Sequence, residues 1–307
     1  MVDRHLTVLT GSPSLAPLLA RGALLSPFKR PRPDAGFPRT RLVLPGLRVD
    51  LARLAAYERV CGFPTGDDAL PPTYPHVLGF PLAMRLMSGR DFPLPLLGLV
   101  HTSVEITQRR ALTATGEYRL TVYVDEVVPH RRGTEAAVVT EVRAADGGRT
   151  GAVGAAGDEA VWESRSTYLA RHRTDGLPGA AALVTSVTSV TSVTDQRDPL
   201  PAVAEWQLAG DVGRRYGAVS GDRNPIHLYP LTARLFGFRG AIAHGMWTVA
   251  RCLAAHGTPA AAVMRADFRA PVPLPGTVTY AAGDGLFALR GADGRTHVTG
   301  GVYPLVS

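Results

Sequence analysis

The spacing of hydrophobic and polar residues changes along the chain and predicts an ordered set of elements. Apolar residues recur at helical spacing from Val49 to Cys61, with Asp50 placed to cap the helix, and a second apolar helix is expected over His76–Met87. Segments that alternate apolar and polar residues follow, separated by turns containing Gly or Pro: Leu96–Arg109, Gly116–Gly133, Glu135–Gly148 and Glu159–His172. This order predicts an α+β unit in which an antiparallel sheet wraps around a helix.

The second half of the chain repeats the order of the first. A helical pattern covers Val212–Ser220, an apolar helix is expected over Gly245–Ala255, and strand-like segments continue to the C-terminus. Two copies of one helix-and-sheet unit are the simplest interpretation of this repetition. The two units are expected to share one sheet and to bury their helices back to back.

Composition places a lead-in and a linker around the two expected domains. Residues 1–40 are rich in Pro and Arg, and we expect them to be loosely ordered apart from a short helix near Leu15–Leu25. The domains are expected at 41–173 and 201–307. The linker between them, 174–200, holds the low-complexity repeat TSVTSVTSVT.

Charge and cysteine content narrow the possible functions. The chain has 307 residues and a net charge of +7, but Lys29 is its one lysine, and the excess of Arg, Ala, Gly, Pro and Val is typical of a GC-rich genome. Basic residues form no stripe with aromatic ones, so no nucleic-acid binding is expected, although a basic surface would attract an acidic carrier protein or a phosphorylated cofactor tail. Cys61 and Cys252 fit no metal spacing and are expected to be reduced and buried. No apolar run approaches the roughly 20 residues of a membrane span, and we expect a cytoplasmic protein.

Candidate chemistry is concentrated between Tyr216 and Ala255. Asp222 and His227 are too far apart in sequence to share one helix face at a spacing of three or four, so they must meet through the turn at Asn224-Pro225. A carboxylate beside an imidazole controls its charge, and such a pair can act as general acid and base. The alternative is a capped loop in which His227 only satisfies backbone groups.

A second group of candidates lies where the apolar helix of the second half begins. Free N–H groups at a helix start attract an oxygen that gains negative charge, and Gly245 would let a carbonyl approach closely, so an oxyanion hole is predicted there. Close helix packing is the alternative explanation of this glycine, and His244 is expected to orient its neighbours or to bond the backbone. A metal bound by Asp222, His227 and His244 is conceivable, but the hydrogen-bonding residues of the segment make it unnecessary, and none is expected. Phosphate-binding loops are absent, and Ser220 lacks the GxSxG setting of a nucleophile.

The segment SGDRNPIH, followed by ARLFGF and AIAHGM, resembles the signature of the MaoC-like, R-specific enoyl-thioester hydratases and dehydratases. These proteins have hot-dog folds. TYPHVLGFPLAMRLMSGRDFP and GLVHTSVEITQRR are similar to the amino-terminal hot dog of the actinobacterial (3R)-hydroxyacyl-thioester dehydratases. The resemblance covers Val49–Val302 and implies a double hot-dog fold, in which the first half is a degenerate repeat that opens an acyl tunnel.

The family's functional residues transfer to matching positions of the second half. The resemblance implies Asp222 and His227 as the catalytic pair, with Ser220 and Asn224 holding them in place. It also implies that the Gly245 N–H binds the thioester carbonyl. The first half lacks a DxNPxH of its own, so no catalytic residue is expected there.

The reaction implied by the resemblance is the reversible loss of water from a (3R)-3-hydroxyacyl thioester, carried on CoA or acyl carrier protein, without a cofactor. One departure is Tyr229, which stands where many relatives have an acidic residue. A hot-dog acyl thioesterase, which could use Asp222 alone as base, and a non-catalytic acyl-thioester-binding subunit are the alternatives. Chain length and physiological direction stay open, as does the choice between a monomeric pseudo-dimer and a homodimer.

Overall fold

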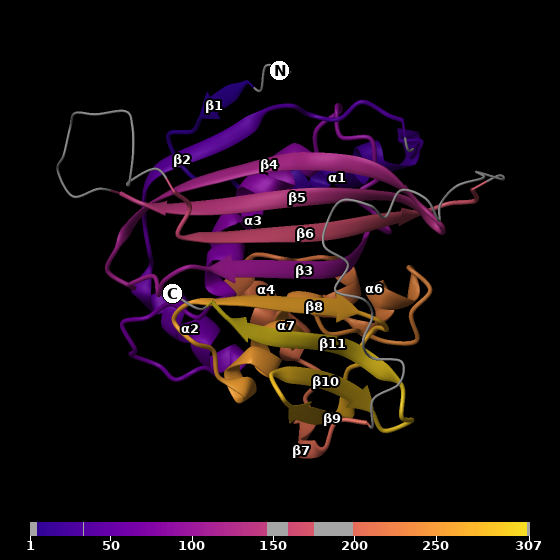
Figure 1. Ribbon diagram of the computed structural model, residues 1–307. Helices are drawn as coiled ribbons and strands as arrows, with labels where there is room; N and C mark the ends of the chain where they lie inside the picture. The colour runs from indigo at the N-terminus through magenta and orange to yellow at the C-terminus, as the bar shows by residue number, and fades with distance from the viewer. Residues whose placement is uncertain (1–4, 33, 146–158, 175–198, 306–307) are drawn as a thin grey trace.

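One sheet, antiparallel except at one edge, runs through both halves of the chain (Figure 1). The computed structural model describes residues 5–32, 34–145, 159–174 and 199–305, and the sheet has 11 strands within them. The N-terminal half contributes β1 (Leu6–Val8), β2 (Arg41–Arg48), β3 (Val100–Gln108), β4 (Glu117–His130), β5 (Gly133–Ala144) and β6 (Trp162–Arg171). The C-terminal half contributes β7 (Ala202–Leu208), β8 (Ala262–Phe268), β9 (Gly276–Gly283), β10 (Leu286–Gly291) and β11 (Thr296–Pro304).

The strand order has an approximate two-fold relation about the contact between β3 and β8. One side carries β3, β6, β5, β4 and β2, and the other carries β8, β11, β10, β9 and β7 in the matching places. At the centre β3 and β8 pair antiparallel, and the Arg265 guanidinium lies 2.5 Å from the Glu105 carboxylate across the contact. The chain is therefore an α+β double hot-dog with a shared sheet, which confirms the fold expected from the sequence.

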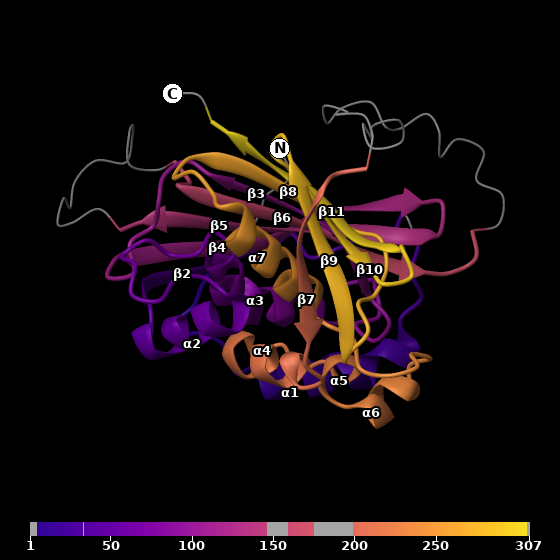
Figure 2. The ribbon, with the colours of Figure 1, turned by 90° about the horizontal axis from the view of Figure 1, so that it is seen from below.

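Each unit places two helices on the same side of the sheet (Figure 2). The first unit has α2 (Leu51–Cys61) and α3 (Tyr74–Met87), and the second has α4 (Val212–Ser220) and α7 (Gly245–His256). Helix α2 begins as predicted, because the Asp50 carboxylate accepts a hydrogen bond from the Arg53 N–H at 3.1 Å. It ends at Gly62, whose left-handed φ of 80° suits a residue without a side chain.

The helices of the two units contact each other and fill one core. The Trp247 indole N–H of α7 donates to the Val60 carbonyl of α2 at 2.9 Å, and the Arg53 guanidinium of α2 donates to the Val219 carbonyl of α4 at 2.6 Å. A continuous cluster of buried apolar side chains includes residues of both halves. The two halves therefore form one packed body with a shared core.

The N-terminal lead-in differs from the expectation of a loosely ordered segment. Strand β1 pairs in parallel with β2, and helix α1 (Leu15–Leu25) occupies the residues where a short helix was predicted. The Lys29 ammonium donates to the carbonyls of Gly89 and Phe92, at 2.8 and 2.6 Å, and burial lowers the pKa of Lys29 to about 8. Pro and Arg dominate the composition here, but leucines that pack on the core hold the segment in place. Nearly all of the predicted linker, including its repeat, lies outside the described residues.

Two further expectations concern cysteines and membrane spans. Cys61 and Cys252 are buried free thiols, and burial raises the pKa of both, so they are inert as nucleophiles. In the part of the chain that the structure describes, every helix is too short or too polar to cross a bilayer.

Candidate active site

The turn that carries Asp222 and His227 lies directly against α4. Two glycines of this helix allow the close approach: a side chain at Gly213 would place its Cβ 1.9 Å from the His227 carbonyl oxygen, and one at Gly217 would come within 2.9 Å of the Asp222 carbonyl oxygen. A bulkier residue at either position would push the turn away from the helix. The sequence of α4 thus fixes where the carboxylate and the imidazole lie.

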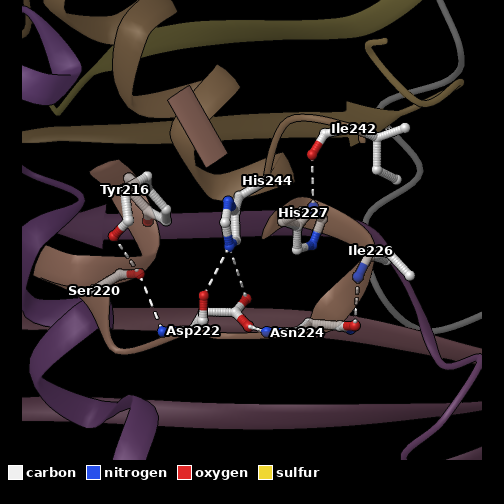
Figure 3. A network of polar contacts seen from close by, with 8 residues as sticks. All are labelled: Tyr216, Ser220, Asp222, Asn224, Ile226, His227, Ile242 and His244. Atoms are coloured by element: carbon white, nitrogen blue, oxygen red, sulfur yellow. Dashed lines mark hydrogen bonds and ion pairs between the residues drawn. The ribbon is translucent and has the colours of Figure 1, made fainter. Parts of the chain in front are cut away.

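Hydrogen bonds within the turn hold the Asp222 carboxylate in place (Figure 3). The Ser220 hydroxyl donates to the Tyr216 carbonyl at 2.8 Å and accepts from the Asp222 N–H at 3.2 Å. The Asn224 N–H donates to Asp222 Oδ1 at 3.1 Å, while the Asn224 side-chain oxygen accepts the Ile226 N–H at 3.4 Å. Ser220 and Asn224 therefore support the turn through its backbone, and neither side chain bonds the carboxylate itself.

His227 belongs to the short helix α5 (Pro225–Leu228) and is 8% exposed. Its Nδ1 lies 2.8 Å from the Ile242 carbonyl oxygen (Figure 3). Because a carbonyl only accepts hydrogen bonds, Nδ1 carries the proton, and Nε2 of the neutral ring is left with a free lone pair. Burial lowers the pKa of His227, while the neighbouring Asp222 charge opposes that shift. The arrangement presents a neutral imidazole as a potential base.

His244 caps the N-terminus of α7 and completes a compact trio with Asp222 and His227. Its Nε2 donates to the Asp222 carbonyl oxygen at 2.9 Å and lies 3.9 Å from Asp222 Oδ2. The His244 ring stacks on His227 with centroids 3.8 Å apart. Burial, reinforced by His227, lowers the pKa of His244 to about 3, so the ring is neutral at physiological pH. The structure thus shows the backbone bond that the sequence predicted for His244.

The same trio could in principle hold a metal ion. One ligand atom from each of the three residues lies within 4.8 Å of the other two. Each imidazole, however, already uses one nitrogen to bond a backbone carbonyl, which leaves one nitrogen per ring for any ion. The trio is well ordered by hydrogen bonds alone, and a metal-free site stays a prediction.

Gly245 is the first residue of α7, so its N–H has no partner within the helix. A Cβ at this position would lie 2.8 Å from the Phe268 ring. Close packing against Phe268 and access for a ligand carbonyl both explain the glycine, and the two explanations are compatible. The N–H directly follows His244, which places it at the edge of the trio.

The N-terminal half adds three aromatic side chains that reasoning from the sequence missed. His101 of β3 stacks on Tyr168 of β6, with centroids 4.5 Å apart, and lies 4.7 Å from Phe268. His76 of α3 lies parallel to His101 at 6.2 Å. Burial lowers the pKa of His76 to about 4 and raises the pKa of Tyr168, and the Asp222 charge adds a smaller upward shift to each, so both side chains are within electrostatic reach of the carboxylate. The only signal in the sequence was the position of both histidines inside segments already singled out.

Comparison with known proteins identifies the family and supports the fold. The MaoC like domain family matches residues 194–285, the part that holds the trio. The chain is 34% identical over 284 residues to 3-hydroxyacyl-thioester dehydratase X of Mycobacterium tuberculosis, covering 90% of this chain and 92% of the relative.

Solved structures agree with this relationship. The crystal structure of HtdX of Mycobacterium tuberculosis is 33% identical, with a TM-score of 0.68, over 86% of this chain and 100% of that one. A MaoC-like dehydratase from Phytophthora capsici shares the fold at 19% identity and a TM-score of 0.64, over 87% and 94% of the two chains.

The shared sheet and the Asp–His turn beside a helix N-terminus define a double hot-dog protein with one candidate acid–base site. The chain belongs to the MaoC-like dehydratase family. The expectation of an enzyme of the hydro-lyase class is thereby confirmed.

Proposed function

We propose that the protein catalyses the reversible dehydration of (3R)-3-hydroxyacyl thioesters to trans-2-enoyl thioesters. The observation that carries the proposal is the bond from His227 Nδ1 to the Ile242 carbonyl, because it aims a basic Nε2 into the space shared with the Asp222 carboxylate. The name of the mycobacterial relative, a 3-hydroxyacyl-thioester dehydratase, supports the same reaction class. The carrier is CoA or acyl carrier protein.

In the hydration direction, Asp222 and His227 hold the attacking water between them. The water oxygen bonds to C3 while one of the pair takes a proton, and a proton is delivered to C2, so that the elements of water add across the double bond. Dehydration follows the same steps in reverse. The thioester oxygen, which gains negative charge during the reaction, accepts a hydrogen bond from the Gly245 N–H at the start of α7. This fixed donor stabilises the transition state more than the bound substrate.

His244 acts in this scheme as a positioning residue. It is neutral and bonds the Asp222 backbone, and its ring supports the face of His227. Its unprotonated state matters because a charged His244 would raise the cost of protonating His227 beside it.

The test is the loss of enoyl-thioester absorbance on hydration by the wild type, Asp222→Asn and His227→Gln. Both substitutions keep side-chain size, and each should lower kcat by roughly 10²–10⁴-fold, the contribution typical of a positioned acid or base. His256→Gln is the matched control, because His256 ends α7 and bonds Tyr280 at the far end of that helix.

Full activity in either site variant would contradict the proposal. Free thiol is followed in the same reactions. Thiol release without hydration would identify a thioesterase, and tight acyl-CoA binding with neither reaction would identify a binding subunit.

A further inference from the structure

The N-terminal half contains a small recess lined by both polar and apolar side chains. Helix α3 contributes His76 to it, and strands β5 and β6 contribute Thr140, Ser166 and Tyr168, with apolar side chains completing the lining. No carboxylate, lysine or arginine is among the lining residues. The recess thus offers neutral hydroxyl and imidazole groups in an otherwise apolar surface.

Two of these polar groups are buried without a hydrogen-bond partner. Ser166 is 2% exposed, and its Oγ makes no well-formed hydrogen bond in the described residues, although the Tyr168 hydroxyl lies near it. The Nδ1 of His76 is likewise buried and unpartnered there. Buried polar atoms are normally satisfied, so unpaired atoms on the wall of a recess are expected to pair with an ordered water or with a polar group of a ligand that displaces it.

The recess lies next to the proposed acid–base pair. His76 and Tyr168 line it, and both are within reach of the Asp222 charge. The aromatic contacts of His101 with Tyr168 and Phe268 continue from this wall to the start of α7. The recess is thus near enough to the proposed site to receive part of an acyl chain whose C2–C3 bond faces Asp222.

We propose that this recess binds an uncharged oxygen-bearing group, a hydroxyl or a ketone, carried by the acyl chain beyond C3. The inference rests on the proposed function and adds to it a class of substrate. A plain hydrocarbon would leave Ser166 and His76 unpaired in an apolar setting, which costs binding energy. A carboxylate would be desolvated without a counter-charge and repelled by Asp222, and no charged side chain lines the recess to pair with an ammonium group, so a neutral oxygen is the chemistry that fits best.

The experiment compares pairs of enoyl-CoAs of equal length that differ only in a hydroxyl or keto group at successive positions from C5 onward. For at least one position, the wild type should turn over the oxygenated member with a kcat/KM at least tenfold higher than that of its alkyl partner. Ser166→Ala should reduce this ratio about three- to tenfold, the effect of one neutral hydrogen bond. His76→Phe should reduce it by a similar factor.

Ser164→Ala is the matched control. Ser164 lies two residues earlier on β6, is 1% exposed, and has an equally unpartnered Oγ, but it does not line the recess. It should leave the ratio unchanged. Equal or faster turnover of the alkyl members at every position, or an equal effect of Ser164→Ala and Ser166→Ala, would overturn the inference.

Failure of the proposed function is separately visible. If the wild type hydrates no enoyl thioester, calorimetric binding of the corresponding saturated acyl-CoAs gives the same comparison through their dissociation constants. Tighter binding of the oxygenated member, lost in Ser166→Ala, would still support the recess, whereas equal binding of both members would overturn it.

Discussion

Burial sets the charge of the histidines in this site, and one hydrogen bond sets the tautomer of His227. Three of them, His76, His101 and His244, are held neutral by burial, which lowers their pKa values to about 4, 3 and 3. For His227, burial lowers the pKa as well, and the Ile242 carbonyl selects the tautomer. Neutral histidines keep the site free of positive charge other than what the reaction itself creates.

These lowered pKa values predict a stability that falls in mild acid. The unfolded chain binds protons at these histidines near pH 6.5, whereas the folded chain resists them, so the free energy of unfolding decreases as the pH falls from about 6.5 toward 4. Each fully resistant histidine contributes up to about 1.4 kcal/mol per pH unit in that window. Urea unfolding of the wild type at pH 7 and pH 5 measures the loss.

His101→Phe provides the comparison for this prediction. Phenylalanine keeps the ring contacts with Tyr168 and Phe268 and removes one titrating group. The variant should lose less stability than the wild type between pH 7 and pH 5. An identical loss in both proteins would show that His101 is not held neutral.

At the residue scale, the sequence predicts contacts between residues that are close together in the chain. The Asp222–His227 turn, the His244 backbone bond and the helix start at Gly245 all lie within one short segment, and the structure brings them together. His76, by contrast, meets this segment only after the two halves have joined, and no spacing along the chain encodes that distance.

Among the elements, the short helix α4 positions the turn that carries Asp222 and His227. It supports the Asp–His turn through two glycines, and its neighbour α2 donates from Arg53 to its C-terminal turn. Residues that touch no substrate therefore control the placement of the proposed base.

Gly213→Ala tests this support. The new Cβ would lie 1.9 Å from the His227 carbonyl oxygen, which is backbone and yields only if the turn moves. We expect a loss of about 1–3 kcal/mol of stability, as in other overpacked sites, with a fall in kcat larger than any change in KM. Thermal unfolding and enoyl-CoA hydration measure the two effects.

Gly210→Ala is the control for this variant. Its Cβ would meet the Pro275 ring at 3.6 Å, an ordinary contact. Near-normal stability and activity are expected there. Normal kcat in Gly213→Ala would mean that the turn tolerates displacement.

Helices and strands were predicted well wherever the signal is periodic. Helix α4 spans the predicted residues, Asp50 caps α2, and the strand-like segments of both halves became β3 to β6 and β8 to β11. The prediction of a loosely ordered lead-in was wrong for β1, which pairs with β2 about 35 residues later. Composition alone does not predict such a long-range pairing.

At the scale of the whole molecule, the sheet and the core cross from one half to the other without interruption. Six residue pairs join β3 to β8, and side chains of α2 and α7 form hydrogen bonds to backbone carbonyls of helices in the other half. The sequence predicted two units in one sheet, but the order of strands and the identity of the joining pair depend on long-range contacts that periodicity does not contain.

We expect the two halves to unfold together in spite of their duplicated order. The two halves share a single core and a continuous sheet, so separating them would expose apolar side chains and a sheet edge of each. Calorimetry should give one transition with equal calorimetric and van't Hoff enthalpies. Glu105→Gln should change the unfolding free energy by no more than about 1 kcal/mol, because the ion pair with Arg265 is partly exposed to solvent. Two separated transitions would show that the halves are independent.

The two-fold relation between the halves also affects how the substrate preference of this protein can evolve. In a dimer of identical single units, every substitution appears twice, once beside the reacting bond and once where it lines the chain. Here Ser166 occurs in one half and His227 in the other, so a mutation in the recess leaves the proposed acid–base turn untouched. A duplicated chain can therefore acquire new acyl preferences while its chemistry stays constant.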